Sequence, residues 1–279
     1  MNFINYNGEI LPAAQPVLTI ANRGFRYGDG LFESMRYMNG KLQYAELHAQ
    51  RLQRGMATLK LEGFKKISAD FLRKKVDELV RRNSCGQNAR VRLTVFRDSD
   101  GLYSPTGNQF AYTLELSSSD ESSYIHAAKG LIVDVYDEVT KPVNTLANLK
   151  TCNSLVYVMA GIYRKQKSLD EVFILNSNGF LCEAMSANVF VVFKKKIYTP
   201  ALSEGCIAGV MRSVTMQLAK DNKMEVIEAQ INPDILNEAE EVFLTNATRG
   251  IQWVMGFNNK RYFNEVAKDL QEKLNSSIA

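Results

Sequence analysis

With 279 residues, the chain is long enough for one large domain or two of ordinary size. Its hydrophobic fraction of 46% and charged fraction of 23% are those of a globular protein, which excludes disordered and fibrous classes. The net charge of +4 comes from 34 basic and 30 acidic residues without a long block of one sign, so we expect no nucleic-acid partner.

The first half of the chain shows alternating helix and strand patterns. We predict helices over 46–61 and 68–83, the second capped by Ser68, with an apolar face made of Leu72, Val76, Leu79 and Val80. Residues 89–96 and 110–116 alternate apolar and polar side chains and are predicted to be strands. An antiparallel sheet flanked by helices is therefore expected in this half.

Gly28, Asp29 and Gly30 form a turn by composition. We expect the residues around this turn to line a strand as an aromatic wall with two charges: Phe25, Tyr27, Leu31, Phe32, Glu33 and Arg36. A lone Gly-Asp-Gly carries little weight on its own.

A run of serines and acidic residues at 117–123 is the most polar stretch of the sequence and the best candidate linker. We place a first domain at 1–117, a linker at 118–125 and a second domain at 126–279.

The second half begins with a predicted strand at 131–136 and continues into a helix after Lys150. This helix carries Leu155, Val156, Val158, Met159 and Ile162 at three- and four-residue spacing, and we expect that face to be buried.

Further along, the sequence predicts a meander over 171–199, with a turn at 176–179 and a hairpin tip at Lys194 to Lys196. A helix within 205–220, strands at 241–245 and 251–254, and a last helix at 264–275 complete the chain. This order predicts α/β or α+β layers.

The chain offers no pattern typical of a metal site, a signal peptide or a membrane span. Its two histidines and four cysteines lack metal-ligand spacing, and no Cys-x-x-Cys pair occurs: His48, His126, Cys85, Cys152, Cys182 and Cys206. No apolar stretch approaches 18 residues, and the N-terminal segment lacks the regions of a signal peptide. We expect a cytoplasmic enzyme with free thiols, no metal and no membrane partner.

Lys150 and Glu183 are the most informative pair of residues, because pyridoxal phosphate needs an amine to bind its aldehyde and a carboxylate to hold a proton on its ring nitrogen. The cofactor phosphate needs fixed donors, and the small residues of Gly205 to Gly209 before a helix meet that need. Arg51 lies beside the apolar stripe of its helix, where its guanidinium suits a phosphate or covers apolar neighbours.

Five segments in this order resemble the class IV aminotransferases, the fold type IV pyridoxal phosphate enzymes that include branched-chain aminotransferase, D-amino acid aminotransferase and aminodeoxychorismate lyase. They are RGFRYGDGLFES, LHAQRL, LKTCNSL, EAMSANVF and GVMR. The resemblance spans nearly the whole chain. It implies a small N-terminal α/β domain, a larger C-terminal domain with a mixed β-sheet or barrel-like core, and a homodimer.

By this resemblance, Lys150 forms the imine with pyridoxal phosphate and moves the substrate proton, and Glu183 pairs with the pyridine nitrogen. The phosphate is assigned to Arg51, the backbone of Val210 and Met211, and Asn246. The substrate is assigned to Phe32, Arg36 and Tyr103 and to the amides of Ala247 and Thr248, with Arg36 also a candidate for strand pairing.

Departures from the family pattern keep two activities open. Branched-chain aminotransferases usually have a tyrosine where Leu155 stands, and the lyases tend to have threonines where Glu33 and Ser34 stand. We expect an aminotransferase acting on an amino acid and a 2-keto acid, similar to the branched-chain enzymes. The alternative is an aminodeoxychorismate lyase, which eliminates pyruvate to give p-aminobenzoate.

Overall fold

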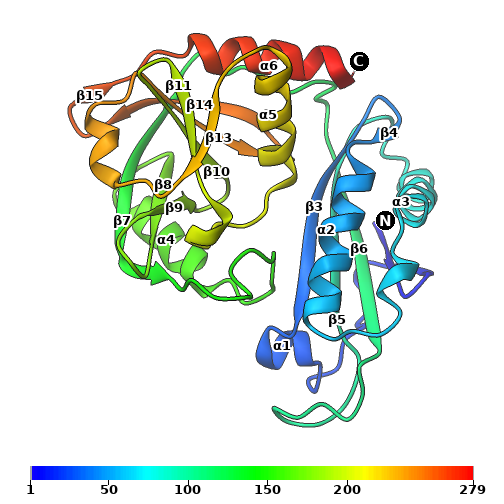
Figure 1. Ribbon diagram of the computed structural model, residues 1–279. Helices are drawn as coiled ribbons and strands as arrows, with labels where there is room; N and C mark the ends of the chain where they lie inside the picture. The colour runs from blue at the N-terminus through cyan, green and yellow to red at the C-terminus, as the bar shows by residue number, and fades with distance from the viewer. Residues whose placement is uncertain (1, 279) are drawn as a thin grey trace. The chain divides into compact units, whose positions relative to one another are not determined.

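A computed structural model describes residues 2–278, which divide into two compact units (Figure 1). Unit 1 runs to Ser122 and also includes Leu149–Ser154. Unit 2 consists of Ser123–Asn148 and of the chain from Leu155 onward. The segment that carries Lys150 thus packs with unit 1, whereas the sequence analysis assigned it to the second domain.

Unit 1 is built on a six-stranded antiparallel sheet with the order β2-β1-β6-β5-β3-β4. Its strands are β1 (Phe3–Tyr6), β2 (Glu9–Pro12), β3 (Gly30–Met38), β4 (Lys41–Leu42), β5 (Ala89–Arg97) and β6 (Phe110–Ser118). The strands expected from alternation at 89–96 and 110–116 are confirmed as β5 and β6.

Two helices, α2 (Ala45–Thr58) and α3 (Ala69–Asn83), lie against this sheet (Figure 1). The predicted cap is present, since the Ser68 hydroxyl accepts a hydrogen bond from the Phe71 amide at 3.1 Å. The apolar face predicted for α3 is buried against the sheet as expected. A 3-10 helix (Phe64–Lys66) connects the two helices.

The residues before the Gly-Asp-Gly turn do not form a strand, which corrects the sequence analysis. Phe25 and Tyr27 belong to a short helix, α1 (Arg23–Tyr27), which Asn22 caps through its side chain. Gly28 ends this helix in the left-handed region with φ +64°, where glycine is favoured. The aromatic wall is therefore limited to the strand residues that follow.

Unit 2 is built on a nine-stranded mixed sheet with the order β12-β11-β10-β13-β14-β7-β8-β9, and β15 pairs with β14. The strands are β7 (Leu131–Lys141), β8 (Glu171–Asn176), β9 (Leu181–Ala184), β10 (Asn188–Phe193), β11 (Lys196–Pro200), β12 (Val226–Ala229), β13 (Glu241–Asn246), β14 (Gly250–Phe257) and β15 (Lys260–Arg261). The terminal strand β9 also lies beside β10, so the sheet curls back on itself, as a barrel-like core requires.

The helices of unit 2 are α4 (Leu155–Gln166), α5 (Val210–Asp221) and α6 (Glu265–Ile278), with 3-10 helices at Leu202–Glu204 and Pro233–Asn237. The helices expected within 205–220 and at 264–275 are confirmed as α5 and α6. Within residues 2–278, no helix combines the length and the apolar character needed to cross a membrane.

The apolar stripe of α4 is exposed, which corrects the expectation that it is buried. Its exposed members follow helical spacing: Leu155, Val158, Met159 and Ile162. The opposite side of the helix packs on the sheet through Val156, Tyr157 and Ala160. The periodicity identified an apolar face correctly, but it could not show which part of the chain, if any, covers that face.

Candidate active site

Lys150 lies in an extended segment that pairs with the edge of β3. The Lys150 carbonyl accepts a hydrogen bond from the Phe32 amide at 2.9 Å, and the Cys152 amide donates to the Gly30 carbonyl at 2.9 Å. Leu31 and Thr151 form an antiparallel bridge between these two bonds. The backbone of Lys150 is thus fixed as in a strand, five residues before α4 begins.

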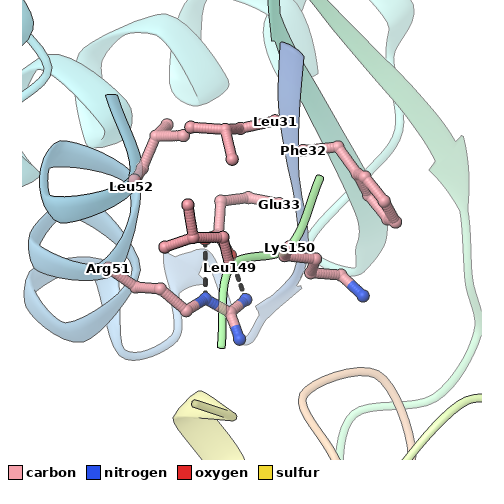
Figure 2. Close-up of a pocket in the computed structure, with 8 residues that line it drawn as sticks. Leu31, Phe32, Glu33, Arg51, Leu52, Leu149 and Lys150 are labelled. Carbon is pink, nitrogen blue, oxygen red and sulfur yellow. Dashed lines mark hydrogen bonds and ion pairs between the residues drawn. The ribbon is translucent and has the colours of Figure 1, made fainter. Parts of the chain in front are cut away.

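The half-buried Lys150 side chain lies over an aromatic ring of unit 1. Its Nζ is 4.3 Å from the ring centroid of Phe32, and the Arg92 guanidinium carbon is 4.1 Å from the same centroid. Figure 2 shows Lys150 and Phe32 projecting to the same side of β3. Two cations therefore contact one aromatic ring, an arrangement that favours an anionic ligand close by.

The predicted residue Arg51 lines a small hollow of unit 1 together with Glu33, Leu149 and Lys150 (Figure 2). The Arg51 Nε donates to Glu33 Oε1 at 2.8 Å, and its Nη2 donates to Glu33 Oε2. Both side chains are buried. Arg51 is thus held inside the unit, and the reading of a surface arginine over apolar neighbours is wrong.

His48 completes this buried cluster, since its Nδ1 lies 2.6 Å from Glu33 Oε2. Burial alone would raise the pKa of Glu33, but Arg51 and His48 outweigh it and lower the pKa to about 2. Burial lowers the pKa of His48, against the opposing effect of Glu33. We therefore assign a carboxylate, a guanidinium and a neutral imidazole, with the imidazole proton on Nδ1.

In unit 2, Glu183 on β9 is 2% exposed and accepts three hydrogen bonds. Lys141 Nζ donates to Oε1 at 2.5 Å, the Tyr157 hydroxyl donates to Oε1 at 2.7 Å, and the Ile207 amide donates to Oε2 at 2.8 Å. Burial and then Glu183 raise the pKa of Tyr157, so its hydroxyl stays protonated and donates. These three donors fix the position of the Glu183 carboxylate.

Val210 and Met211 are the first two residues of α5, where backbone amides have no intrahelical acceptor. The preceding Gly209 has no side chain to cap them, and a Cβ at this position would stand 1.9 Å from Asn188 Oδ1. Only glycine fits there. The start of this twelve-residue helix is therefore suited to an anion through its amides and its dipole.

Asn246 ends β13 and organises the turn that follows. Its Oδ1 accepts bonds from the Thr248 amide, the Thr248 hydroxyl and the Arg249 amide, and its amide group donates to the Ser186 carbonyl. The Ala247 carbonyl accepts from the Tyr124 hydroxyl at 3.0 Å. The Thr248 amide, expected to face a substrate, donates to Asn246 in this structure.

The remaining two predicted residues lie apart from Lys150 within unit 1. Arg36 is buried and donates to Glu121 Oε2 at 2.9 Å and to the Glu121 carbonyl at 3.1 Å, in the polar stretch expected to be a linker. Tyr103 lies on the exposed loop between β5 and β6, with its ring 5.5 Å from that of Tyr27.

Several residues of these clusters were missed in the sequence analysis, namely Glu33 as a partner of Arg51, and His48, Arg92, Lys141, Tyr157 and Ile207. One signal was available for Glu33, because it occupies the same face of the strand as the apolar residues Leu31 and Met35. An acid on such a buried face implies that a cation lies beside it. Lys141 follows ten strand residues without such a pattern, and the role of a backbone amide leaves no trace in a sequence.

Comparison with known proteins identifies the family. The model of the family described as amino-transferase class IV matches residues 30–255, most of the chain. The chain belongs to the class IV aminotransferase family. The matched range includes β3, the Lys150 segment, Glu183 and the start of α5.

Relatives of this class IV chain carry different activities in their names. A putative branched-chain-amino-acid aminotransferase of Methanocaldococcus jannaschii is 27% identical, over 97% of this chain and 94% of the relative. An aminodeoxychorismate lyase of Vibrio harveyi is 25% identical, over 94% and 97% respectively. The structure of a branched-chain amino acid aminotransferase from Thermobaculum terrenum in its PLP form shares the fold, with a TM-score of 0.86 at 17% identity, over 99% and 94% of the chains.

Proposed function

We propose that this class IV chain is a pyridoxal-phosphate-dependent aminotransferase that moves an amino group between an amino acid and a 2-keto acid. The observation that carries the proposal is the environment of Glu183. A buried carboxylate held in place by Lys141, Tyr157 and the Ile207 amide is suited to hold a proton on a pyridine nitrogen.

The residues present fit this cofactor. Lys150 supplies an amine on a fixed backbone, and Arg51 and the first amides of α5 supply donors for a phosphate. When bound, pyridoxal phosphate supplies an aldehyde and a ring that accepts electrons.

Each proposed residue has a task. Lys150 would hold the cofactor through its amine and would move the α-proton of the substrate. Glu183 holds the ring proton. Arg51, the amides of Val210 and Met211, and Asn246 bind the phosphate.

We assign the substrate to a second set of residues: Phe32, Arg36, Tyr103, Ala247 and Thr248. The ring of Phe32 lies directly beside Lys150 and therefore forms a wall for an apolar side chain. This supports a substrate similar to those of the branched-chain enzymes. Arg92, beside the same ring, adds a cation suited to a carboxylate.

An aminodeoxychorismate lyase is the second candidate, favoured by the relative of that name and by Leu155. The side chain of Leu155 is 71% exposed and has no hydroxyl to offer. In the lyase reaction the same lysine removes the α-proton, and pyruvate leaves the substrate. Only transamination requires a keto acid acceptor.

The test uses the purified protein and Lys150→Ala, both reconstituted with excess pyridoxal phosphate. We expect a visible absorbance band in the natural protein that Lys150→Ala abolishes, and turnover of branched-chain amino acids that stops without a keto acid. Pyruvate release from aminodeoxychorismate without an acceptor would identify the lyase instead. A natural protein that takes up no cofactor would refute both activities.

We also propose that the chain acts as a homodimer in the cytoplasm. The exposed apolar stripe of α4 supports a second copy as its cover. The four cysteines are free among the described residues, as expected in a reducing compartment. Light scattering and cell fractionation test the two statements.

A further inference from the structure

Glu33 is a buried carboxylate that the proposed reaction does not use. It lies on the helix-facing side of β3, between Leu31 and Met35, and is 1% exposed. A carboxylate in such a place is costly unless cations and hydrogen bonds compensate it. The side chains that contact Glu33 therefore indicate its role.

Both oxygens of Glu33 are occupied by the same guanidinium. Arg51 Nε donates to Oε1 at 2.8 Å and Arg51 Nη2 to Oε2, which is the two-pronged geometry that fixes the plane of an arginine side chain (Figure 2). A guanidinium carries five N–H donors, and Glu33 accepts from two of them.

His48 fixes the carboxylate in turn. Its Nδ1 is 2.6 Å from Glu33 Oε2, and it comes from α2, one turn before Arg51 on the same helix. His48 Nε2 is buried without a hydrogen-bond partner among the described residues, which is unfavourable for a polar atom. Two elements, β3 and α2, thus determine where the guanidinium points.

We propose that Glu33, braced by His48, is a positioning residue that aims the Arg51 guanidinium at the cofactor phosphate. This inference rests on the proposed function, in which Arg51 binds that phosphate. Glu33 and Arg51 have opposite charges, so the cluster offers the phosphate directed donors and little net positive charge.

This account differs from one in which Glu33 only neutralises Arg51. Removing the charge of Glu33 would strengthen phosphate binding if Glu33 merely cancelled a cation. Removing it would weaken phosphate binding if Glu33 orients the cation. The sign of the change therefore separates the two roles.

The experiment compares dissociation constants of the full-length chain, freed of cofactor, for pyridoxal phosphate and for pyridoxal, which lacks the phosphate. In Glu33→Gln, one carboxylate oxygen becomes an amide that cannot accept from Arg51. We expect affinity for pyridoxal phosphate to fall roughly tenfold, equivalent to about 1.4 kcal/mol, with affinity for pyridoxal unchanged. Unchanged or tighter binding of pyridoxal phosphate would overturn the proposal.

Two controls make the result specific. Glu46→Gln alters an exposed glutamate, on α2, that pairs with Arg73, and it should alter neither affinity. Arg51→Ala should reduce the preference for the phosphorylated ligand at least as strongly as Glu33→Gln does. If Arg51→Ala keeps that preference, the proposed phosphate role of Arg51 fails; if only Glu33→Gln keeps it, the positioning role alone fails.

Binding of pyridoxal also reports whether each variant is folded. If Glu33→Gln loses both ligands, Glu33→Asp decides, because it keeps the charge but is one methylene too short for both bonds to Arg51. We expect Glu33→Asp to bind pyridoxal normally and pyridoxal phosphate several-fold more weakly. An unchanged ratio of the two affinities in Glu33→Asp would refute the positioning role.

Discussion

The pair formed by Lys141 and Glu183 shows how one buried contact serves both stability and chemistry. Each side chain is almost entirely buried, and their charged atoms are 2.5 Å apart. A buried pair of this kind can be neutral for stability as a whole, yet removing one partner leaves an uncompensated charge that costs about 3–5 kcal/mol. The cation also fixes the carboxylate that the proposed cofactor needs.

We predict that Lys141→Met lowers the free energy of unfolding by about 3–5 kcal/mol and lowers kcat at least roughly tenfold. Without Lys141, the Glu183 carboxylate loses one of its three hydrogen-bond donors and is no longer fixed where it holds the ring proton. Urea denaturation and steady-state kinetics with saturating cofactor measure the two effects.

The double variant Lys141→Met/Glu183→Gln separates stability from catalysis. It contains no unpaired charge, so it should be more stable than Lys141→Met, but it should remain inactive because the carboxylate is gone. Lys196→Met is the matched control, since Lys196 pairs with Glu225 on the surface. A double variant as unstable as Lys141→Met would show that the charges are not coupled.

At the scale of the element, the hairpin between β10 and β11 is closed by two residues that are unfavourable there. Phe193 pairs with Lys196, so Lys194 and Lys195 form a two-residue turn with φ of +50° and +62°. Such turns favour asparagine and glycine, because a Cβ is strained at positive φ. The Glu240 carboxylate offsets part of the strain by accepting both turn amides, at 3.0 and 3.2 Å.

We predict that Lys195→Gly raises the free energy of unfolding by about 0.5–1 kcal/mol, because relief of the strain exceeds the added flexibility of the unfolded chain. The backbone amide that donates to Glu240 is retained. Urea denaturation measures the change. Lys195→Ala removes the same charge but keeps the Cβ, and should bring no gain. Equal stabilisation by both variants would assign the effect to charge.

Local chemistry made many of these elements predictable from the sequence. The Ser68 cap, the alternation along β5 and β6 and the three lysines of the hairpin each act within a few residues, and each was placed correctly. The Lys150 segment was not, because its pairing with β3 joins residues more than 100 positions apart. The helix α1 was missed since it has only five residues and a strongly aromatic composition.

The residues of the candidate site show the same difference between what nearby residues determine and what distant residues determine. Lys150, Glu183 and Arg51 could be named from motifs, because their residue types are those that an aldehyde, a ring nitrogen and a phosphate require. Their partners could not, since Lys141 lies 42 positions from Glu183 and Glu33 lies 18 from Arg51. Only the fold brings such residues within hydrogen-bond distance.

At the scale of the whole molecule, the apolar stripe on α4 is exposed to solvent in the single chain. Leu155, Val158, Met159 and Ile162 follow the i, i+3, i+4, i+7 spacing of a helix face made for packing. Leu146 and Val143, from the segment before α4, are exposed apolar residues of the same unit. A contiguous exposed apolar surface marks an interface, and a twofold dimer lets the same face cover itself.

We predict that the natural protein has twice the chain mass of 31.4 kDa by light scattering, and that Val158→Asp converts it to a monomer. A carboxylate at this position would be desolvated against a like charge across a twofold axis, which weakens association by several kcal/mol. Phe263→Asp is the matched control, because Phe263 is an apolar residue of unit 2 that is 72% exposed and lies outside the stripe. A dimer that survives Val158→Asp, or one that only Phe263→Asp disrupts, would place the interface on another face.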